Sequence, residues 1–312
     1  MTVKLFGDFK YILYIKTHYK KYVSSIITFR KDGDVDSVDL IFIISTYNEY
    51  QIYNKSIKNK FVFLDKNILN LKDSLFLFST WFLKTTSPLF NFASNSRYLF
   101  YKNNNHTIIR SSSLGYANFD NLKTLENIGI SDIIDLRPNS TFIDKFLSIK
   151  CKIKYHNISF GNYKGIDYNH PLVYDDISIS YMYLIEQHEV INNVFKTIIN
   201  SERQVLIFCK YGRDRTGIVS ILIGLLLNRP IKDILFDYLL SCIYLHNSYD
   251  KIPVYGDIKY PTYFLRGTKL LDLLNKFKDK YQSVDNYLNI IGLNLEDIIK
   301  LKLKVSDYDE NI

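Results

Sequence analysis

The feature that most constrains this chain is a loop from Cys209 to Gly217 that lies between an apolar strand and an apolar helix. Val205 to Phe208 is a short apolar run typical of a buried strand, and Ile218 to Leu227 carries no charge, which predicts a buried helix. The loop therefore ends at a helix N-terminus, where unpaired N–H groups and the helix dipole favour a bound anion. We expect Gly212 and Gly217 to let the backbone curl, so that successive N–H groups point into one concavity that holds phosphate.

The residue types in this loop suit phosphoryl transfer. The thiolate is the nucleophilic form of cysteine, and the N–H groups, the helix start and Arg215 all favour the thiolate of Cys209. Arg215 presents a planar fork that fits two phosphate oxygens and remains charged as the transition state develops. Attack by Cys209 predicts a thiophosphate intermediate that water hydrolyses, with the Thr216 hydroxyl donating to the departing sulfur. An isolated cysteine is usually a small core residue, but the loop's glycines, Asp214, Thr216 and the strand–loop–helix setting disfavour that interpretation.

The loop resembles the Cys-x5-Arg loop of protein tyrosine phosphatases, and in detail the bacterial tyrosine-protein phosphatase family whose loop reads H-C-x-x-G-K-D-R-T-G. Further blocks of the same family follow in family order and extend the resemblance over about residues 91 to 305: Ile109–Leu114, Gly129–Arg137, Asp237–Ser241 and Tyr281–Leu293. The resemblance implies an α/β fold with a tyrosine-phosphatase-like central sheet flanked by helices. It also implies a cysteine-dependent phosphoric monoester hydrolase.

The resemblance implies which residues form the site. Cys209, Arg215, Asp214 and Thr216 are expected to be catalytic. A second set is expected to bind phosphate or substrate: Lys210, Tyr211, Gly212, Arg213, Asp135 and Arg137. Lipid and inositol phosphatases often have a lysine directly after the cysteine, so Lys210 either meets an additional phosphate or faces solvent.

Three departures from the family pattern stand out. Phe208 replaces the histidine that normally braces the loop, so we expect a less favoured thiolate or slower turnover. Arg213 replaces a lysine and keeps its charge. The family's N-f-R-D-l-G-G stretch survives only as Asn91-Phe92, followed by Ala-Ser-Asn-Ser-Arg at residues 93–97. The loss of its Arg-Asp pair and both glycines predicts a divergent substrate or weak activity.

The general acid has several candidates. We favour Asp214, because repulsion from a bound phosphate dianion favours the protonated form of a neighbouring carboxyl group, which suits a proton donor. Asp135 closes a predicted strand and is an alternative. Asp167, Asp175 and Asp176 lie in the stretch 161–176, where other tyrosine phosphatases carry an acid on a closing loop, although loop carboxylates are more often simply solvated.

Three functions are compatible with these residues. The first is hydrolysis of phosphotyrosine, phosphoinositides or other small phosphate esters. The second is a phosphate-binding pseudophosphatase, suggested by Phe208 and the altered stretch 91–97, although the intact nucleophile argues against it. The third is another cysteine-loop enzyme, such as a sulfurtransferase or arsenate reductase. Arsenate reduction needs resolving cysteines, and Cys151 and Cys242 are distant in sequence.

Composition places the chain among globular proteins. Hydrophobic residues make up 47% and charged residues 23% of its 312 residues, which favours a packed core over disorder. No apolar run approaches the roughly 20 residues of a transmembrane helix, and no standard signal peptide is recognisable. The three cysteines suit a reducing compartment, so we expect a cytoplasmic protein, without excluding secretion by another route.

The net charge of +8 is spread along the chain. No block of consecutive basic residues stands out, so we expect no nucleic-acid partner. A mild positive field attracts phosphorylated proteins, lipids or small molecules and permits peripheral contact with an anionic membrane. No Cys/His cluster has metal-ligand spacing, so we expect neither a metal nor another cofactor.

The chain is expected to contain two parts. Residues 1–88 read as a β-rich N-terminal domain or elaboration that is structural or shapes the substrate site, with strands at Phe9–Tyr19, Ser37–Asn48 and Lys60–Leu64. Residues 89–312 read as the catalytic domain, because strands and helices alternate. Its expected elements are strands at Thr107–Arg110, Asp132–Asp135 and Lys152–Ile158, helices at Asn118–Ile128 and Ser178–Asn200, and a helical cap over Thr268–Leu303.

Overall fold

The computed structural model describes residues 2–7, 25–28, 40–45, 61–65, 88–100, 108–115, 117–138, 151–161, 177–246 and 266–306. The chain divides into two compact units. One unit comprises Met1–Thr86 with His246–Leu271, and the other comprises Ser87–Leu245 with Asp272–Ile312.

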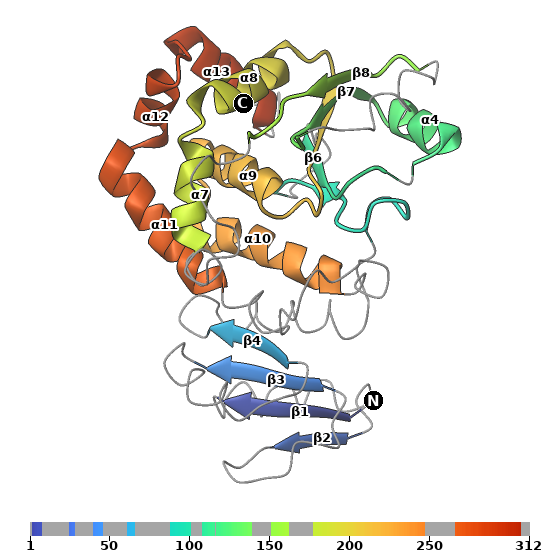
Figure 1. Ribbon diagram of the computed structural model, residues 1–312, viewed down its shortest axis with the longest axis vertical. Coiled ribbons are helices and arrows are strands. Elements are labelled where there is room, and N and C mark those ends of the chain that lie inside the picture. The colour runs from blue at the N-terminus through green and yellow to red at the C-terminus, as the bar shows by residue number, and fades with distance from the viewer. Residues whose placement is uncertain are drawn as a thin grey trace, which may run out of the picture. The chain divides into compact units, whose positions relative to one another are not determined.

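The first unit contains a four-stranded sheet in the order β2-β1-β3-β4 (Figure 1). Its strands are β1 (Thr2–Gly7), β2 (Ser25–Thr28), β3 (Leu40–Ser45) and β4 (Phe61–Asp65). All three pairings are parallel, and parallel neighbours require crossover connections where antiparallel strands can use two-residue hairpins. Two predicted strands coincide with β3 and β4, while Phe9–Tyr19 lies outside the described residues.

The second unit is built on a five-stranded sheet in the order β5-β6-β9-β7-β8. Its strands are β5 (Arg97–Tyr98), β6 (Ile108–Ser111), β7 (Ile130–Asp135), β8 (Lys154–Asn157) and β9 (Gln204–Phe208). Only β5 is antiparallel to its neighbour. In the ladder, Phe208 pairs with Ser111 on one side and with Asp135 on the other. The chain after β9 therefore emerges between the segments that follow β6 and β7.

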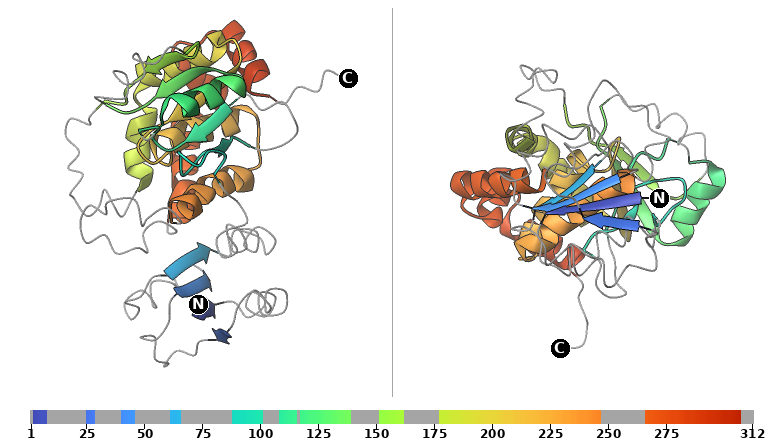
Figure 2. Two further views of the ribbon diagram at one scale, coloured as in Figure 1. Left: turned by 90° about the vertical axis from the view of Figure 1, so that its right-hand side faces the viewer. Right: turned by 90° about the horizontal axis from the view of Figure 1, so that it is seen from below.

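Helices cover both faces of this sheet (Figures 1 and 2). The helix α4 (Phe119–Asn127) lies on one face, and the remaining helices gather on the other. They are α7 (Ile177–Ile185), α8 (His188–Asn200), α9 (Arg215–Leu226), α10 (Ile231–His246), α11 (Arg266–Tyr281), α12 (Val284–Ile290) and α13 (Leu295–Val305). The prediction of a central sheet flanked by helices, with helical C-terminal segments, is confirmed.

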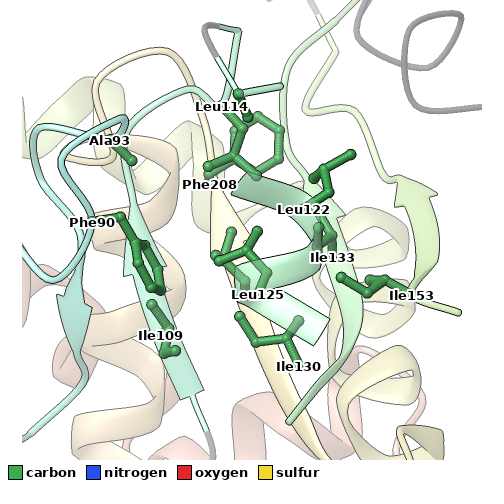
Figure 3. Packing of buried hydrophobic residues seen from close by; sticks show 12 residues of the cluster. Phe90, Ala93, Ile109, Leu114, Leu122, Leu125, Ile130, Ile133, Ile153 and Phe208 are labelled. Carbon is green, nitrogen blue, oxygen red and sulfur yellow. The ribbon is translucent and has the colours of Figure 1, made fainter. Parts of the chain in front are cut away.

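The core under α4 follows from strand alternation (Figure 3). Ile109, Ile133 and Phe208 point to the same face of the sheet and pack with Leu122 and Leu125 of α4. On the other side of the sheet, ten of the twelve residues of α9 are buried. The uncharged run at Ile218–Leu227 is therefore a buried helix, as predicted.

The prediction of one long helix over Ser178–Asn200 is wrong, because α7 and α8 are separate helices. Gln187 N donates to Leu184 O at 3.2 Å, a bond that closes the last turn of α7. Gln187 then takes up non-helical angles and its side-chain oxygen accepts from Gly161 N at 2.9 Å. Neither Gly nor Pro lies at the break between α7 and α8, so the local sequence does not reveal it. The break is accompanied by a tertiary contact, the hydrogen bond from Gly161 N to the Gln187 side chain.

Candidate active site

The predicted loop joins β9 to α9 at the carboxyl end of the sheet. Cys209 follows the last residue of β9 and is only 3% exposed. Asp214 is the N-cap residue of α9, and its side chain makes no capping hydrogen bond. A ligand beyond the carboxyl ends of the strands would therefore meet the cysteine and the start of a helix together.

The peptide groups of the loop have a definite orientation. Three successive carbonyl oxygens accept hydrogen bonds from groups behind the loop. The donors are Ser113 N to Lys210 O (3.1 Å), Asn95 Nδ2 to Tyr211 O (2.9 Å), and Asn95 Nδ2 and Arg110 Nη2 to Gly212 O (3.1 and 2.7 Å). A trans peptide places each carbonyl opposite the next N–H. The N–H groups of Tyr211, Gly212 and Arg213 therefore point away from these supports, which forms the expected anion-facing concavity.

Gly212 is required by this geometry. Its φ is +66°, and a Cβ there would lie 2.1 Å from Ser111 O. Gly217 does not share this role, because it lies inside α9 without a positive φ and a Cβ there would meet the Tyr238 ring at 3.4 Å. The expectation that both glycines curl the loop is therefore wrong for Gly217, which instead permits close packing of α9.

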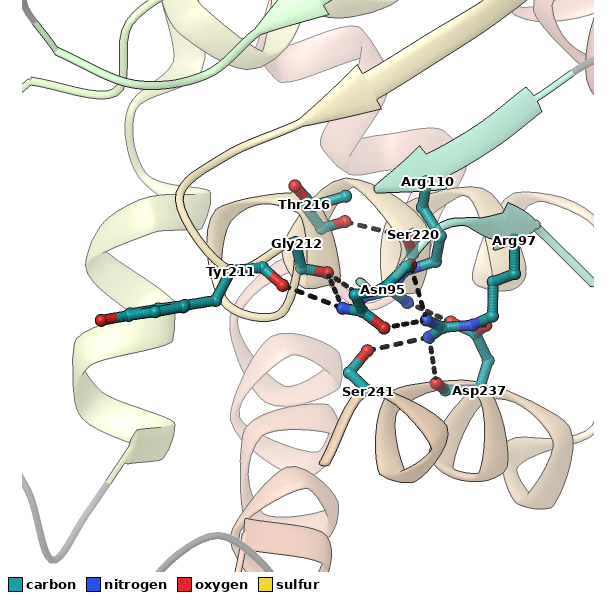
Figure 4. A network of polar contacts seen from close by, with 9 residues as sticks. All are labelled: Asn95, Arg97, Arg110, Tyr211, Gly212, Thr216, Ser220, Asp237 and Ser241. Atoms are coloured by element: carbon teal, nitrogen blue, oxygen red, sulfur yellow. Dashed lines mark hydrogen bonds and ion pairs between the residues drawn. The ribbon is translucent and has the colours of Figure 1, made fainter. Parts of the chain in front are cut away.

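Two side chains at the start of α9 are open to a ligand. Arg215 is half-buried and, among the described residues, has no hydrogen-bond or ion-pair partner. Thr216 is 1% exposed, and its Oγ1 is buried without a hydrogen bond within the described part of the chain. In Figure 4 this hydroxyl points away from Ser220, whose own hydroxyl donates to the Thr216 carbonyl. An uncompensated cation and an unsatisfied hydroxyl suit a site completed by a bound anion.

Asp214 is held by neighbours on two sides. The Tyr181 hydroxyl donates to its Oδ1, and Arg213 donates to both carboxylate oxygens at 3.2 and 3.1 Å. Tyr181 also shares a 2.7 Å hydrogen bond with the Tyr238 hydroxyl. Arg213 is buried and engaged with this carboxylate, so its charge lies beside the candidate acid.

Asp135 and Arg137 form a supporting pair beside the loop. The fully buried Asp135 carboxylate accepts from Arg137 Nε and Nη2 at 2.9 and 2.8 Å and from the Tyr155 hydroxyl at 2.6 Å. Arg137 Nη1 also donates to Ser113 Oγ at 2.8 Å. Burial lowers the pKa of Arg137, but the hydrogen bonds and charge of Asp135 outweigh it, so the pKa is raised overall. Asp135 is fully buried whereas Asp214 is half-buried, so Asp135 is less accessible than Asp214 to a leaving oxygen.

Phe208 fills the place where the resembling family has histidine. Its ring is fully buried in the apolar cluster under α4 (Figure 3), and the Arg137 guanidinium carbon lies 5.0 Å from the ring centroid. An aromatic face favours such a cation. Phe208 therefore braces the base of the loop by packing and by this contact.

Lys210 and Tyr211 form the outer side of the loop. Lys210 is exposed, and its Nζ lies 5.2 Å from the centroid of the half-buried Tyr211 ring. In Figure 4 the Tyr211 ring points away from the polar contacts behind the loop. The exposure of Lys210 is compatible both with contact to an additional phosphate and with a solvent-facing position.

A buried polar network behind the loop was missed by sequence reasoning (Figure 4). Arg97 on β5 and Arg110 on β6 both pair with Asp237 of α10, with Arg97 Nε 3.1 Å from Asp237 Oδ1. Arg97 also donates to Ser241 Oγ at 2.8 Å and to Asn95 Oδ1. The available signal was Asp237, a lone carboxylate in an otherwise apolar stretch of α10.

Asp167, Asp175 and Asp176 lie outside the described residues. No group of three or more potential metal ligands occurs in the part of the chain that the structure describes. Among the described helices, none combines the length and apolar character needed to cross a membrane.

A groove of about 780 Å³ lies along β8 and α8, and none of the predicted site residues lines it. The two lysines that line it are paired with carboxylates. Lys154 lies 2.7 Å from Glu202, and Lys196 lies 2.6 Å from Asp297. Both lysines lie beside carboxylates, whereas Arg215 has no ion-pair partner among the described residues, so the loop is better suited to phosphate than the groove is.

The fold and the loop define the class of α/β proteins that place a cysteine inside an anion-facing loop. Residues 102–306, more than half of the chain, match the model of the tyrosine phosphatase family, and the chain belongs to this family. It is therefore an enzyme of the cysteine-dependent phosphoric monoester hydrolase type.

Several solved phosphatase structures are similar to the chain. The catalytic domain of the PP-IP phosphatase Siw14 from S. cerevisiae is 16% identical, covering 65% of this chain and 96% of that one, with a TM-score of 0.33. TpbA from P. aeruginosa is 13% identical, covering 60% and 87%, with a TM-score of 0.32. A putative phosphatase from Neisseria meningitidis is 16% identical, covering 47% and 92%, with a TM-score of 0.27. Among curated proteins, no sequence match is found.

Proposed function

We propose that the chain hydrolyses phosphate monoesters through a cysteinyl-phosphate intermediate. The Cys209 thiolate attacks phosphorus, an S–P bond forms, and the ester P–O bond breaks as Asp214 gives the leaving oxygen a proton. Water then attacks phosphorus, Asp214 takes its proton, and the S–P bond breaks to release inorganic phosphate and the thiolate. Arg215 binds phosphate oxygens in both steps, and Thr216 donates its hydroxyl to the departing sulfur.

The observation that carries this proposal is the orientation of the loop peptides. The carbonyl oxygens of Lys210, Tyr211 and Gly212 are all occupied behind the loop. The opposite N–H groups therefore remain aimed where phosphate would sit, and donors fixed in advance lose little free energy to reorganisation during the reaction. Arg215, which has no partner among the described residues, supplies the matching charge.

The substrate class forms part of the proposal. Phosphotyrosine, phosphoinositides or other small phosphate esters fit a loop whose outer side carries the exposed cation Lys210. The solved structures name PP-IP for Siw14 and pTyr for TpbA, so both chemistries belong in a substrate panel. We also propose that residues 1–88 are either structural or substrate-shaping, that any membrane contact is peripheral, and that the protein works in the cytoplasm, where a reactive thiol stays reduced.

Phosphate release from a panel tests the proposal. The panel contains a phosphotyrosine peptide, phosphoinositides, inositol phosphates and PP-IP, and wild type is compared with Cys209→Ser and Asp214→Asn. We expect Cys209→Ser to release no phosphate. Asp214→Asn should release phosphate at least about 100-fold more slowly than wild type, since a general acid contributes 10²–10⁴-fold. Binding of phosphate esters without any turnover by wild type would instead identify a pseudophosphatase.

A further inference from the structure

The network behind the loop carries an unbalanced charge. Arg97 is 8% exposed, Arg110 is 1% exposed, and both pair with the single carboxylate of Asp237. Burial lowers the pKa of Arg97 to about 10, partly offset by Asp237, so this arginine stays charged at neutral pH. Arginine does not lose its proton in proteins under ordinary conditions. The three side chains therefore hold one surplus positive charge in the interior.

Such a charge is costly unless something compensates it. Arg110 Nε is also buried without a hydrogen-bond partner among the described residues. Arg110 Nη2 donates to Gly212 O at 2.7 Å, so the surplus charge lies directly behind the loop that surrounds Cys209. A thiolate or a phosphate dianion on the other side of the loop is the compensating charge that this geometry calls for.

We propose that Arg110 is a positioning residue of the phosphatase reaction. Together with Arg97 and Asp237 it places one buried positive charge behind the loop, and through its bond to Gly212 O it keeps the loop peptide turned toward the anion. It thereby stabilises the Cys209 thiolate and the bound phosphate without touching either. This inference rests on the proposed role of Cys209 as a thiolate nucleophile.

Other charged and titratable groups also lie around the loop that holds Cys209. The titratable and charged side chains of the described elements around the loop are Arg97, Arg110, Asp135, Arg137, Tyr155, Tyr181, Lys210, Arg213, Asp214, Arg215, Asp237 and Tyr238. Apart from Arg97, Arg110 and Asp237, which form the network itself, these groups are unchanged by substitutions in the network. Single substitutions within the network therefore report its own effect.

The test measures the rate at which iodoacetamide alkylates Cys209 as a function of pH, followed on the Cys209 peptide by mass spectrometry. In Arg110→Gln the surplus charge is lost, so we expect the midpoint of the profile to rise by about one pH unit. In Asp237→Asn the surplus increases by one, so we expect the midpoint to fall by a similar amount. Arg110→Lys keeps the charge and should hold the midpoint near wild type, while kcat/KM for a phosphate ester falls about tenfold because the bond to Gly212 is weakened.

Alkylation midpoints that shift in opposite directions in Arg110→Gln and Asp237→Asn indicate an electrostatic effect. A loosened loop would shift both midpoints in the same direction. Ser241→Ala is the matched control, because it removes one bond of Arg97 without a change in charge and should leave the midpoint unchanged. Midpoints that rise in both Arg110→Gln and Asp237→Asn would show a scaffold only and overturn the inference. If Arg110→Gln does not fold, the alkylation midpoint of Asp237→Asn still tests the inference: a midpoint below that of wild type supports it, and a midpoint at or above that of wild type overturns it. An ordinary thiol profile in wild type, with no phosphate release, would overturn the proposed function itself.

Discussion

Asn95 Nδ2 lies 3.1 Å from the carbonyl oxygen of Gly212, although the two residues are 117 positions apart in the chain. The same amide also donates to Tyr211 O at 2.9 Å. Asn95 belongs to the stretch whose family motif is missing. The contact shows that this stretch nevertheless supports the loop, so its altered sequence alone does not indicate a lost function.

Replacing Asn95 with alanine should impair catalysis. Asn95→Ala leaves Tyr211 O without this donor and leaves Gly212 O with Arg110 Nη2 alone, and an unsatisfied group costs about 1–3 kcal/mol. We expect kcat/KM for a phosphate ester to fall at least about tenfold, measured by phosphate release. Ser94→Ala is the control, since within the described part of the chain the Ser94 side chain bonds to Ser112 Oγ at 3.3 Å and not to the loop, so the rate should stay near wild type. Equal rates for Asn95→Ala and wild type would contradict the support role.

A methyl group at Gly212 should disable the loop. In Gly212→Ala the Cβ would lie 2.1 Å from Ser111 O, and the φ of +66° is unfavourable for alanine. The loop must shift, so we expect phosphate release to slow by about 100-fold or more, equivalent to about 2.7 kcal/mol. Gly115→Ala is the matched control, because its Cβ would come no closer than 3.4 Å to Ser113 Oγ and its φ is not positive. Similar losses in both variants would argue against a specific role of Gly212.

The sequence predicted those parts of the site that depend on neighbours in the chain. The apolar run before Cys209, the uncharged run after it and the glycine at 212 are local patterns, and β9, the loop and α9 follow them. The sequence did not reveal partners that arrive from other elements. Asn95 reaches the loop, and Arg97 reaches Asp237, from the segment around β5, which pairs with β6 at the edge of the sheet.

The histidine missing before Cys209 illustrates the same limit. A comparison of the loop motif alone interprets Phe208 as the loss of the histidine that supports the loop. The structure shows that its ring fills the apolar cluster under α4 and lies against Arg137, which Asp135 holds in place. Side chains from other segments thus supply a support that a motif alone cannot show.

Tyr181→Phe should test how Asp214 is held. The substitution removes the hydroxyl that donates to Asp214 Oδ1. We expect kcat to fall several-fold for an alkyl phosphate, because the acid is less well oriented toward the leaving oxygen. The loss should be smaller for p-nitrophenyl phosphate, whose leaving group needs little help from an acid. Tyr183→Phe, at an exposed position on the same helix, is the control. Equal losses for both substrates would exclude an effect through Asp214.

Tyr287 should make stability depend on pH in the alkaline range. Its ring is fully buried and its hydroxyl donates to Ile185 O at 2.7 Å. Burial, helped by the negative charge that Tyr281 acquires, raises the pKa of Tyr287 far above its usual value. Above about pH 10 the unfolded chain loses this proton while the folded chain keeps it, so the free energy of unfolding falls as pH rises.

Tyr287→Phe removes that titration. Urea unfolding at pH 8 should show a loss of about 1 kcal/mol, since the hydrogen bond to Ile185 is gone. Between pH 10 and 11.5, the free energy of unfolding should fall less steeply than in wild type, by up to about 1.4 kcal/mol per pH unit for one proton. Tyr183→Phe, at an exposed position on α7, is the control for removal of a tyrosine hydroxyl outside the core. If the free energies of unfolding of Tyr287→Phe and wild type ran parallel over this pH range, Tyr287 would ionise equally in the folded and unfolded states. That result would contradict the raised pKa of Tyr287.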